Sequence, residues 1–153
     1  MTVMNNDKEM EHMTLRMNPY LVLNGNAREA IQFYVEALGA EIVGIQSFGD
    51  MPANSDFPLP EAAKDRVAHG LIRVGEAEIM FSDTFPGQTV QQGENVTVCI
   101  MTDDPARSRT LFDALQQGGQ VKMPLQETFW SPAYGTLTDK YGVTFHISTE
   151  AAQ

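Results

Sequence analysis

Apolar and polar positions follow the same order twice along this chain. A short apolar run at 20–23 ends at Asn24-Gly25-Asn26, and the stretch after it carries apolar residues at every third or fourth position: Ala27, Ala30, Ile31, Tyr34 and Leu38. This spacing predicts a strand followed by an amphipathic helix. Asn26 is well placed to cap the helix, and Gly39 supplies the left-handed residue that ends it.

The pattern of residues 26–42 returns at residues 105–121. In this second copy Asp103-Asp104-Pro105 opens the helix, because an aspartate can cap a helix and a proline fits its first turn. The helix is expected to run to about Gln117. Two similar units that cannot each bury a full core are expected to pack against each other.

Strand-like apolar runs complete each copy. They are expected at 41–47, 66–74 and 77–82 in the first copy, and at 96–102, 120–124, 135–139 and 143–148 in the second. Gly75-Glu76 and Lys140-Tyr141-Gly142 hold the glycine that a tight turn needs. The sequence therefore predicts an α+β fold of two β-α-β-β-β modules.

The two modules are expected to form one compact domain. The first module is placed at 17–85 and the second at 95–149, with a polar linker at 86–94. Residues 1–16 show no apolar periodicity and are interpreted as a flexible start. Residues 49–65 hold three prolines and no period, which predicts a long loop that could form a lid.

Composition favours an ordinary soluble protein. Of 153 residues 42% are hydrophobic, and the formal net charge is −10. This charge repels phosphate and anionic lipid, so neither nucleic acid nor a membrane is an expected partner. The single cysteine, Cys99, lies in an apolar run and has no intramolecular disulfide partner, which fits a cytoplasmic location and favours a buried, inert thiol.

Five separated segments carry motifs in a recognisable order, at 24–39, 48–52, 79–83, 126–130 and 138–143. Together they resemble the PhnB-like branch of the vicinal oxygen chelate superfamily, which includes glyoxalase I, extradiol dioxygenases, and bleomycin and fosfomycin resistance proteins. The resemblance implies the glyoxalase/bleomycin resistance fold, in which the modules form a cup-shaped mixed sheet. Relatives often complete their cups in a homodimer, and half-open sheets leave edge strands that need covering, so a homodimer is expected.

The resemblance also implies where a metal would bind. In metal-dependent relatives, ligands come from the first and last strands of each module, and these positions fall near 18–20, Met80, 97–99 and His146. His146 alone is a good ligand type, whereas Zn²⁺, Ni²⁺ or Mn²⁺ needs three or four His, carboxylate or thiolate ligands. We therefore predict no catalytic metal and no cofactor.

An alternative metal site would use other registers of the same strands. His69 would then act with Asp83 or Glu78. His69 is equally well explained as a strand histidine that its neighbours hydrogen bond. Ser82 and Asp83 could face a pocket, but a strand end that enters a turn uses these residue types routinely.

Other chemistries lack their motifs. Some PhnB-like relatives carry a methyltransferase label, which would call for a glycine-rich nucleotide-binding turn, and no G-x-G-x-x-G occurs in the chain. Gly118-Gly119 ends a helix instead of opening one. No G-x-S-x-G occurs either, and Cys99 has no obvious histidine partner, so covalent catalysis is not expected.

Aromatic side chains concentrate in segment 127–134. It holds the only tryptophan, Trp130, together with Phe129, Tyr134 and the carboxylate of Glu127. Apolar walls with a few orienting polar atoms are typical of a small-ligand pocket. Trp130 could instead close the core or the interface between the modules.

The sequence thus predicts metal-free binding of a small apolar or aromatic molecule in the sheet cup, with no catalytic residue assigned. The alternative is a divalent-metal-dependent lyase, isomerase or dioxygenase of the same superfamily. The candidate ligand-binding residues are Tyr20, His69, Ser82, Glu127, Phe129, Trp130 and His146. His146 could equally be a core or rim histidine.

Overall fold

The first module has the predicted order of elements. The computed structural model describes residues 15–52 and 58–151, so residues 1–14 of the predicted start and the middle of the predicted 49–65 loop lie outside it. The elements are β1 (Tyr20–Leu23), α2 (Ala27–Leu38), β2 (Glu41–Ser47), the short 3-10 helices η1 (Phe48–Asp50) and η2 (Glu61–Ala63), β3 (Val67–Val74) and β4 (Ala77–Asp83). The sheet order is β1-β4-β3-β2, with β1 parallel to β4 and the other pairs antiparallel.

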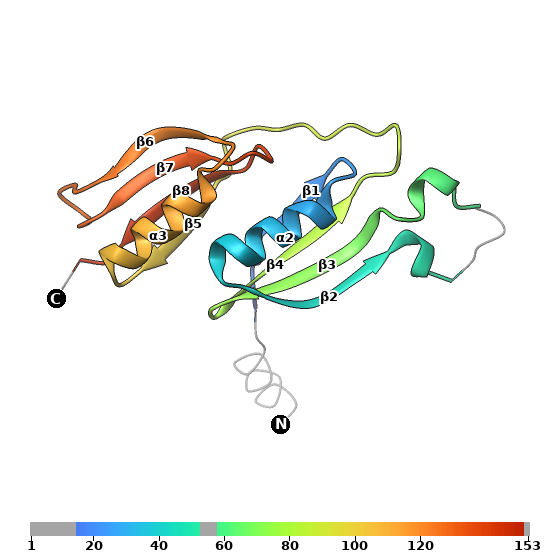
Figure 1. Ribbon diagram of the computed structural model, residues 1–153, viewed down its shortest axis with the longest axis horizontal. Coiled ribbons are helices and arrows are strands. Elements are labelled where there is room, and N and C mark those ends of the chain that lie inside the picture. The colour runs from blue at the N-terminus through green and yellow to red at the C-terminus, as the bar shows by residue number, and fades with distance from the viewer. Residues whose placement is uncertain (1–14, 53–57, 152–153) are drawn as a thin grey trace, which may run out of the picture.

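The second module repeats this arrangement. Its elements are β5 (Val98–Thr102), α3 (Pro105–Leu115), β6 (Gln120–Gln126), β7 (Tyr134–Thr138) and β8 (Thr144–Thr149). The sheet order is β5-β8-β7-β6, again with one parallel pair, β5 and β8. The predicted α+β fold of two β-α-β-β-β modules is therefore confirmed (Figure 1). Within the described residues, no helix is long and apolar enough to cross a membrane.

Of the four residues discussed at the helix ends, three have the predicted role. Gly39 ends α2 with a φ of 64°, in the left-handed region. Asp104 caps α3 by accepting a hydrogen bond from the backbone N–H of Ala106, and Pro105 begins the helix. The prediction for Asn26 was wrong, because its side chain makes no capping bond. The carboxylate of Asp83, at the end of β4, accepts from the Ala27 N–H instead.

Each helix packs on its sheet over a strand glycine. A Cβ at Gly70 on β3 would lie 2.7 Å from Ile31 Cδ1, and one at Gly135 on β7 would lie 2.9 Å from Phe112. Only glycine permits this close approach of helix and strand. The two glycines hold equivalent places, so the internal repeat extends to packing contacts.

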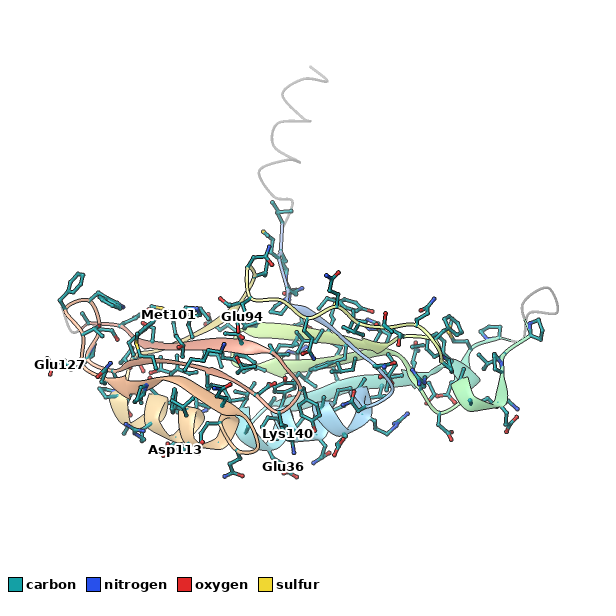
Figure 2. The ribbon with its side chains drawn as sticks, turned by 90° about the horizontal axis from the view of Figure 1, so that it is seen from above. Glu36, Glu94, Met101, Asp113, Glu127 and Lys140 are labelled. Carbon is teal, nitrogen blue, oxygen red and sulfur yellow. The ribbon has the colours of Figure 1, made fainter. Side chains whose placement is uncertain are left out.

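The helices cover one side of both sheets and leave the other side open. Figure 2 shows α2 and α3 on the side that carries Glu36 and Asp113, whereas Met101 points from the opposite side. Along β4 the alternation is clear, since Ile79 and Phe81 are buried toward the helix. We call the side away from the helices the open face.

Aromatic side chains join the two modules. Tyr34 of α2 is fully buried against Phe81 of its own sheet and against Tyr141 and Phe145 of the second module. Its hydroxyl donates a hydrogen bond to the carboxylate of Asp139, the residue that follows β7. We call these five side chains the module joint.

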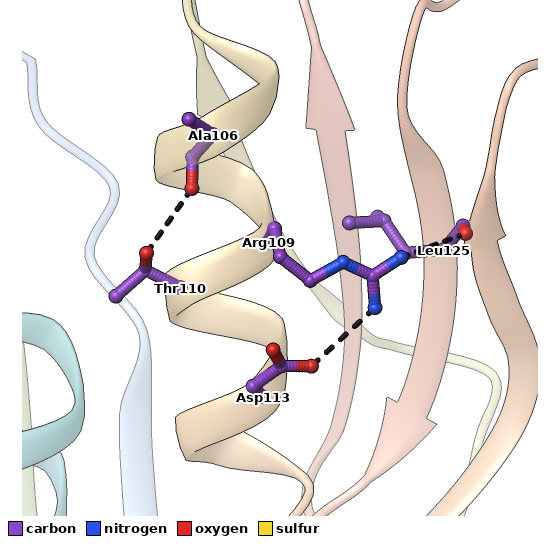
Figure 3. Close-up of polar contacts among 5 residues, drawn as sticks. All are labelled: Ala106, Arg109, Thr110, Asp113 and Leu125. Carbon is purple, nitrogen blue, oxygen red and sulfur yellow. Dashed lines mark hydrogen bonds and ion pairs between the residues drawn. The ribbon is translucent and has the colours of Figure 1, made fainter.

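One arginine ties α3 to the strand beside it. Arg109 donates to the backbone oxygen of Leu125 on β6 over 3.2 Å and lies 3.4 Å from Asp113 one turn along the helix (Figure 3). Thr110 donates to the Ala106 carbonyl within the helix. The end of β6 is thereby fixed to α3 just before segment 127–134.

Candidate functional site

The open face of each sheet displays mostly apolar and neutral polar side chains, with the charged pair Glu78 and Arg73 at one end of the first sheet. Tyr20 and Met101 are 49% and 56% exposed, although both lie on sheet strands. Strand alternation places the following residues on this face: Tyr20, Val22, Met80, Ser82, Cys99, Met101, Thr136 and His146. Exposed apolar side chains that line up over a sheet indicate a surface built to be covered.

The four positions that the resemblance implied for a metal lie in register. Tyr20 is the partner of Met80 across β1 and β4, and Cys99 is the partner of His146 across β5 and β8. One imidazole, one phenol, one thioether and one thiol are a poor donor set for a catalytic divalent metal. Across residues 15–52 and 58–151, no three His, Cys, Asp or Glu side chains gather closely enough to hold a metal ion.

The alternative set around His69 does not form in the described chain. Asp83 points to the helix side, where its carboxylate accepts from the backbone N–H groups of Gly25, Ala27 and Val67 at 2.8 to 3.0 Å. The structural interpretation of Asp83 is thus correct. Glu78 is paired with Arg16. His69 stacks instead on Tyr20, with ring centroids 6.2 Å apart and planes inclined by 10°.

A row of aromatic side chains begins at His146 and crosses the second module. Its Nδ1 is 2.6 Å from the hydroxyl oxygen of Tyr134. The Tyr134 ring lies 5.2 Å from that of Trp130, which in turn lies 4.7 Å from Phe129. The row therefore runs from the middle of the open face to the loop between β6 and β7.

That loop lines a cavity of its own. The cavity has a volume of about 610 Å³, and Glu127, Phe129 and Trp130 are on its wall. Trp130 is 49% exposed, so it does not close the core or the joint between the modules. The predicted site residues thus fall into two groups, with Tyr20, His69 and Ser82 on the first sheet and the others in the second module, where His146 is on β8 and Glu127, Phe129 and Trp130 are in the loop between β6 and β7.

Cys99 differs from its prediction. The residue is exposed on the open face and not buried, because β5 is an edge strand. Neighbouring atoms nevertheless cover part of its thiol, and this desolvation raises the pKa of Cys99. A raised pKa disfavours the thiolate, so Cys99 contributes an apolar contact more readily than a nucleophile.

Tyr134 belongs to the predicted aromatic segment but is not among the predicted ligand-binding residues. It stands two residues before Thr136, which pairs with His146 across β7 and β8. A strand register for this hairpin would have placed the phenol beside the imidazole, since residues two apart share a face. The pattern of apolar residues predicts both strands, but it does not show which residues pair across them.

The fold and the open face define a class of protein that builds ligand sites on paired β-α-β-β-β modules. The chain belongs to the glyoxalase/bleomycin resistance protein/dioxygenase superfamily, whose family model matches residues 16–147. The predicted superfamily is confirmed.

Three relatives align with nearly the whole chain. Protein YjdN of Escherichia coli (strain K12) is 33% identical over 147 residues, which cover 90% of this chain and 97% of YjdN. The crystal structure of protein PA1353 from Pseudomonas aeruginosa shares 35% identity with a TM-score of 0.78, covering 90% and 98% of the two chains. A PhnB protein from Bacillus cereus, described as a putative 3-demethylubiquinone-9 3-methyltransferase, has the same fold at 24% identity, with a TM-score of 0.72 and 88% and 99% coverage.

Proposed function

We propose that this protein binds a small apolar or aromatic molecule on the open faces of its sheets, without a metal ion. The observation that carries the proposal is the set of exposed apolar side chains on those faces, with Tyr20, Val22 and Met101 each more than 40% exposed. Covering such surface with an apolar ligand is favourable by about 25 cal/mol per Å². A ligand of this kind also needs few polar partners.

The His146–Tyr134 pair supplies one polar contact. The Tyr134 hydroxyl occupies Nδ1 of the imidazole, and within the described chain Nε2 has no hydrogen-bond partner. A ring nitrogen held in one orientation can donate to or accept from a ligand that lies over the sheet. The pair therefore orients a ligand, while the apolar neighbours supply most of the binding energy.

A second copy of the chain completes the site in this proposal. Each sheet ends in edge strands, β1 and β2 in the first module and β5 and β6 in the second, and among residues 15–52 and 58–151 no helix covers either open face. Pairing of two chains over these faces would cover the exposed apolar side chains and enclose the ligand. The cup predicted from the resemblance then arises between chains.

The test uses 1-anilinonaphthalene-8-sulfonate, an aromatic probe whose fluorescence rises in apolar sites. Wild-type protein is expected to bind it saturably. Met101→Glu should weaken binding by at least about tenfold, because the new charge must lose water against an apolar ligand. Gln117→Glu adds the same charge after α3, away from the open face, and should leave binding within about twofold.

Two results would contradict the proposal. One is equal weakening by Met101→Glu and Gln117→Glu, which would show that the probe responds to net charge alone. The other is near-stoichiometric metal in protein purified without a histidine tag, lost in His146→Ala. That result would support the metal-dependent lyase, isomerase or dioxygenase instead.

A further inference from the structure

The loop between β6 and β7 forms a second candidate site at the outer end of the molecule. Its cavity of about 610 Å³ is lined by residues 127–132, by Asp103 and Pro105 at the start of α3, and by Glu150 and Ala151 after β8. Figure 2 shows Glu127 at the end of the second module that faces away from the first module. The cavity is therefore separate from the middle of the open face.

Two aromatic rings form one wall of this cavity. Phe129 is 97% exposed and Trp130 is 49% exposed, and their rings meet edge to face at 82°. The Tyr134 ring also packs against Trp130, with centroids 5.2 Å apart. Large aromatic side chains side by side in water leave apolar surface that a bound partner would cover.

The charged side chains that line the cavity are all acidic. Asp103, Glu127 and Glu150 line it, and no lysine or arginine of residues 15–52 and 58–151 does. Within the described residues, none of the three carboxylates takes part in an ion pair. They also do not converge closely enough to hold a metal ion there. A chain with a net charge of −10 strengthens the negative potential at this end.

The loop is held in place before any ligand arrives. Ser131 is 3% exposed, and its hydroxyl donates to the carbonyl of Thr149 over 2.8 Å and accepts from the Thr149 N–H over 3.1 Å. The Thr128 N–H donates to the Ser131 carbonyl, which closes the tip. Arg109 fixes Leu125 just before the loop (Figure 3). A ligand at this loop therefore loses little affinity to ordering of the protein.

We propose that this cavity binds an organic cation, of the quaternary or alkyl ammonium class. Such a cation is attracted by the faces of Trp130 and Phe129 and by carboxylates that need not touch it. It is bulky and weakly hydrated, so it does not require the converging oxygen ligands of Ca²⁺ or Mg²⁺. The site is distinct from the apolar site on the open faces.

The single tryptophan makes the test direct, because Trp130 is on the wall of the cavity and its fluorescence is the only tryptophan signal of the chain. Choline is titrated at constant ionic strength, and 3,3-dimethylbutan-1-ol serves as its uncharged counterpart of the same shape. Choline should change the fluorescence saturably, and the alcohol should bind at least about threefold more weakly. Phe129→Leu should weaken choline binding by roughly two- to fivefold.

A matched pair of variants distinguishes the effect of a charge at the cavity from the effect of the net charge of the chain. Glu127→Gln should weaken choline binding a few-fold, whereas Glu36→Gln, which removes the same charge from the outer face of α2, should not. Equal binding of choline and the alcohol, equal effects of the two glutamine variants, or no saturation by choline would each overturn the proposal. So would saturation by Ca²⁺ that displaces choline. None of these results bears on the naphthalene probe at Met101, so the two sites are tested independently.

Discussion

At the scale of single residues, the buried carboxylate of Asp139 links the two modules. Its Oδ1 accepts from the backbone N–H groups of Tyr141 and Val143, and its other oxygen accepts from the Tyr34 hydroxyl of the first module. Burial raises the pKa of Asp139, and these hydrogen bonds oppose the rise. Burial and the nearby carboxylate also raise the pKa of Tyr34, so its hydroxyl keeps its proton and remains a donor.

The pH dependence of this contact can be predicted with its sign. A raised folded pKa means that the folded state binds the Asp139 proton more tightly than the unfolded state, so this group adds stability as the pH falls through the folded pKa. Tyr34→Phe removes a donor to the ionised form. It should therefore lower the free energy of unfolding by about 1.5–3 kcal/mol at pH 8 and by less at pH 4, as measured by urea unfolding.

A control separates the buried contact from the loss of any tyrosine hydroxyl. Tyr20 is exposed on the open face, so Tyr20→Phe should change the unfolding free energy by less than about 0.5 kcal/mol at either pH. If Tyr34→Phe lowered the free energy of unfolding equally at both pH values, the protonation of Asp139 would not be coupled to the hydrogen bond from Tyr34.

At the scale of elements, the start of α2 depends on a residue from a distant strand. Asp83 ends β4 and is 5% exposed, and its carboxylate accepts from the backbone N–H groups of Gly25 before the helix, of Ala27 at the first position of the helix and of Val67 at the start of β3. One side chain thus joins the first helix to two strands. The neighbouring Asn26, which a local motif would favour, makes no such bond.

Two substitutions distinguish these caps. Asp83→Ala leaves three backbone N–H groups without their acceptor and should destabilise the protein by about 3 kcal/mol or more. Asn26→Ala should cost less than about 0.5 kcal/mol. The midpoints of urea unfolding measure both, with Asp83→Asn as a milder variant if Asp83→Ala does not fold. A larger destabilisation by Asn26→Ala than by Asp83→Ala would show that Asn26 caps the helix.

The same comparison explains what the sequence could predict. Periodicity located both helices and placed the first two strands, 20–23 and 41–47, at their observed bounds, because these depend on neighbouring residues. The Asp83 cap and the Tyr134–His146 contact join residues that are distant in the chain, so no local pattern contains them. The exposure of Cys99 likewise follows from the position of β5 at a sheet edge, which composition does not reveal.

At the scale of the whole molecule, the proposed pairing of two chains over the open faces is testable. Sedimentation equilibrium should give the mass of two chains. Val22→Glu places a charge on the exposed side of the edge strand β1 and should raise the dimer dissociation constant by at least about tenfold. Gln32→Glu on α2 should leave that constant unchanged. A monomer in the wild type, or equal effects of both variants, would contradict the pairing.

The two modules are connected in space by side chains and not by a shared sheet, since each sheet of four strands has its own ladder. The module joint, formed by Tyr34, Phe81, Asp139, Tyr141 and Phe145, therefore connects two sheets that share no strand hydrogen bond, so each sheet is a plate of its own. Substitutions there can change the angle between the plates without breaking a strand hydrogen bond. The fold can thus supply ligand spaces of different width while each module keeps the same backbone, which separates the evolution of specificity from that of stability.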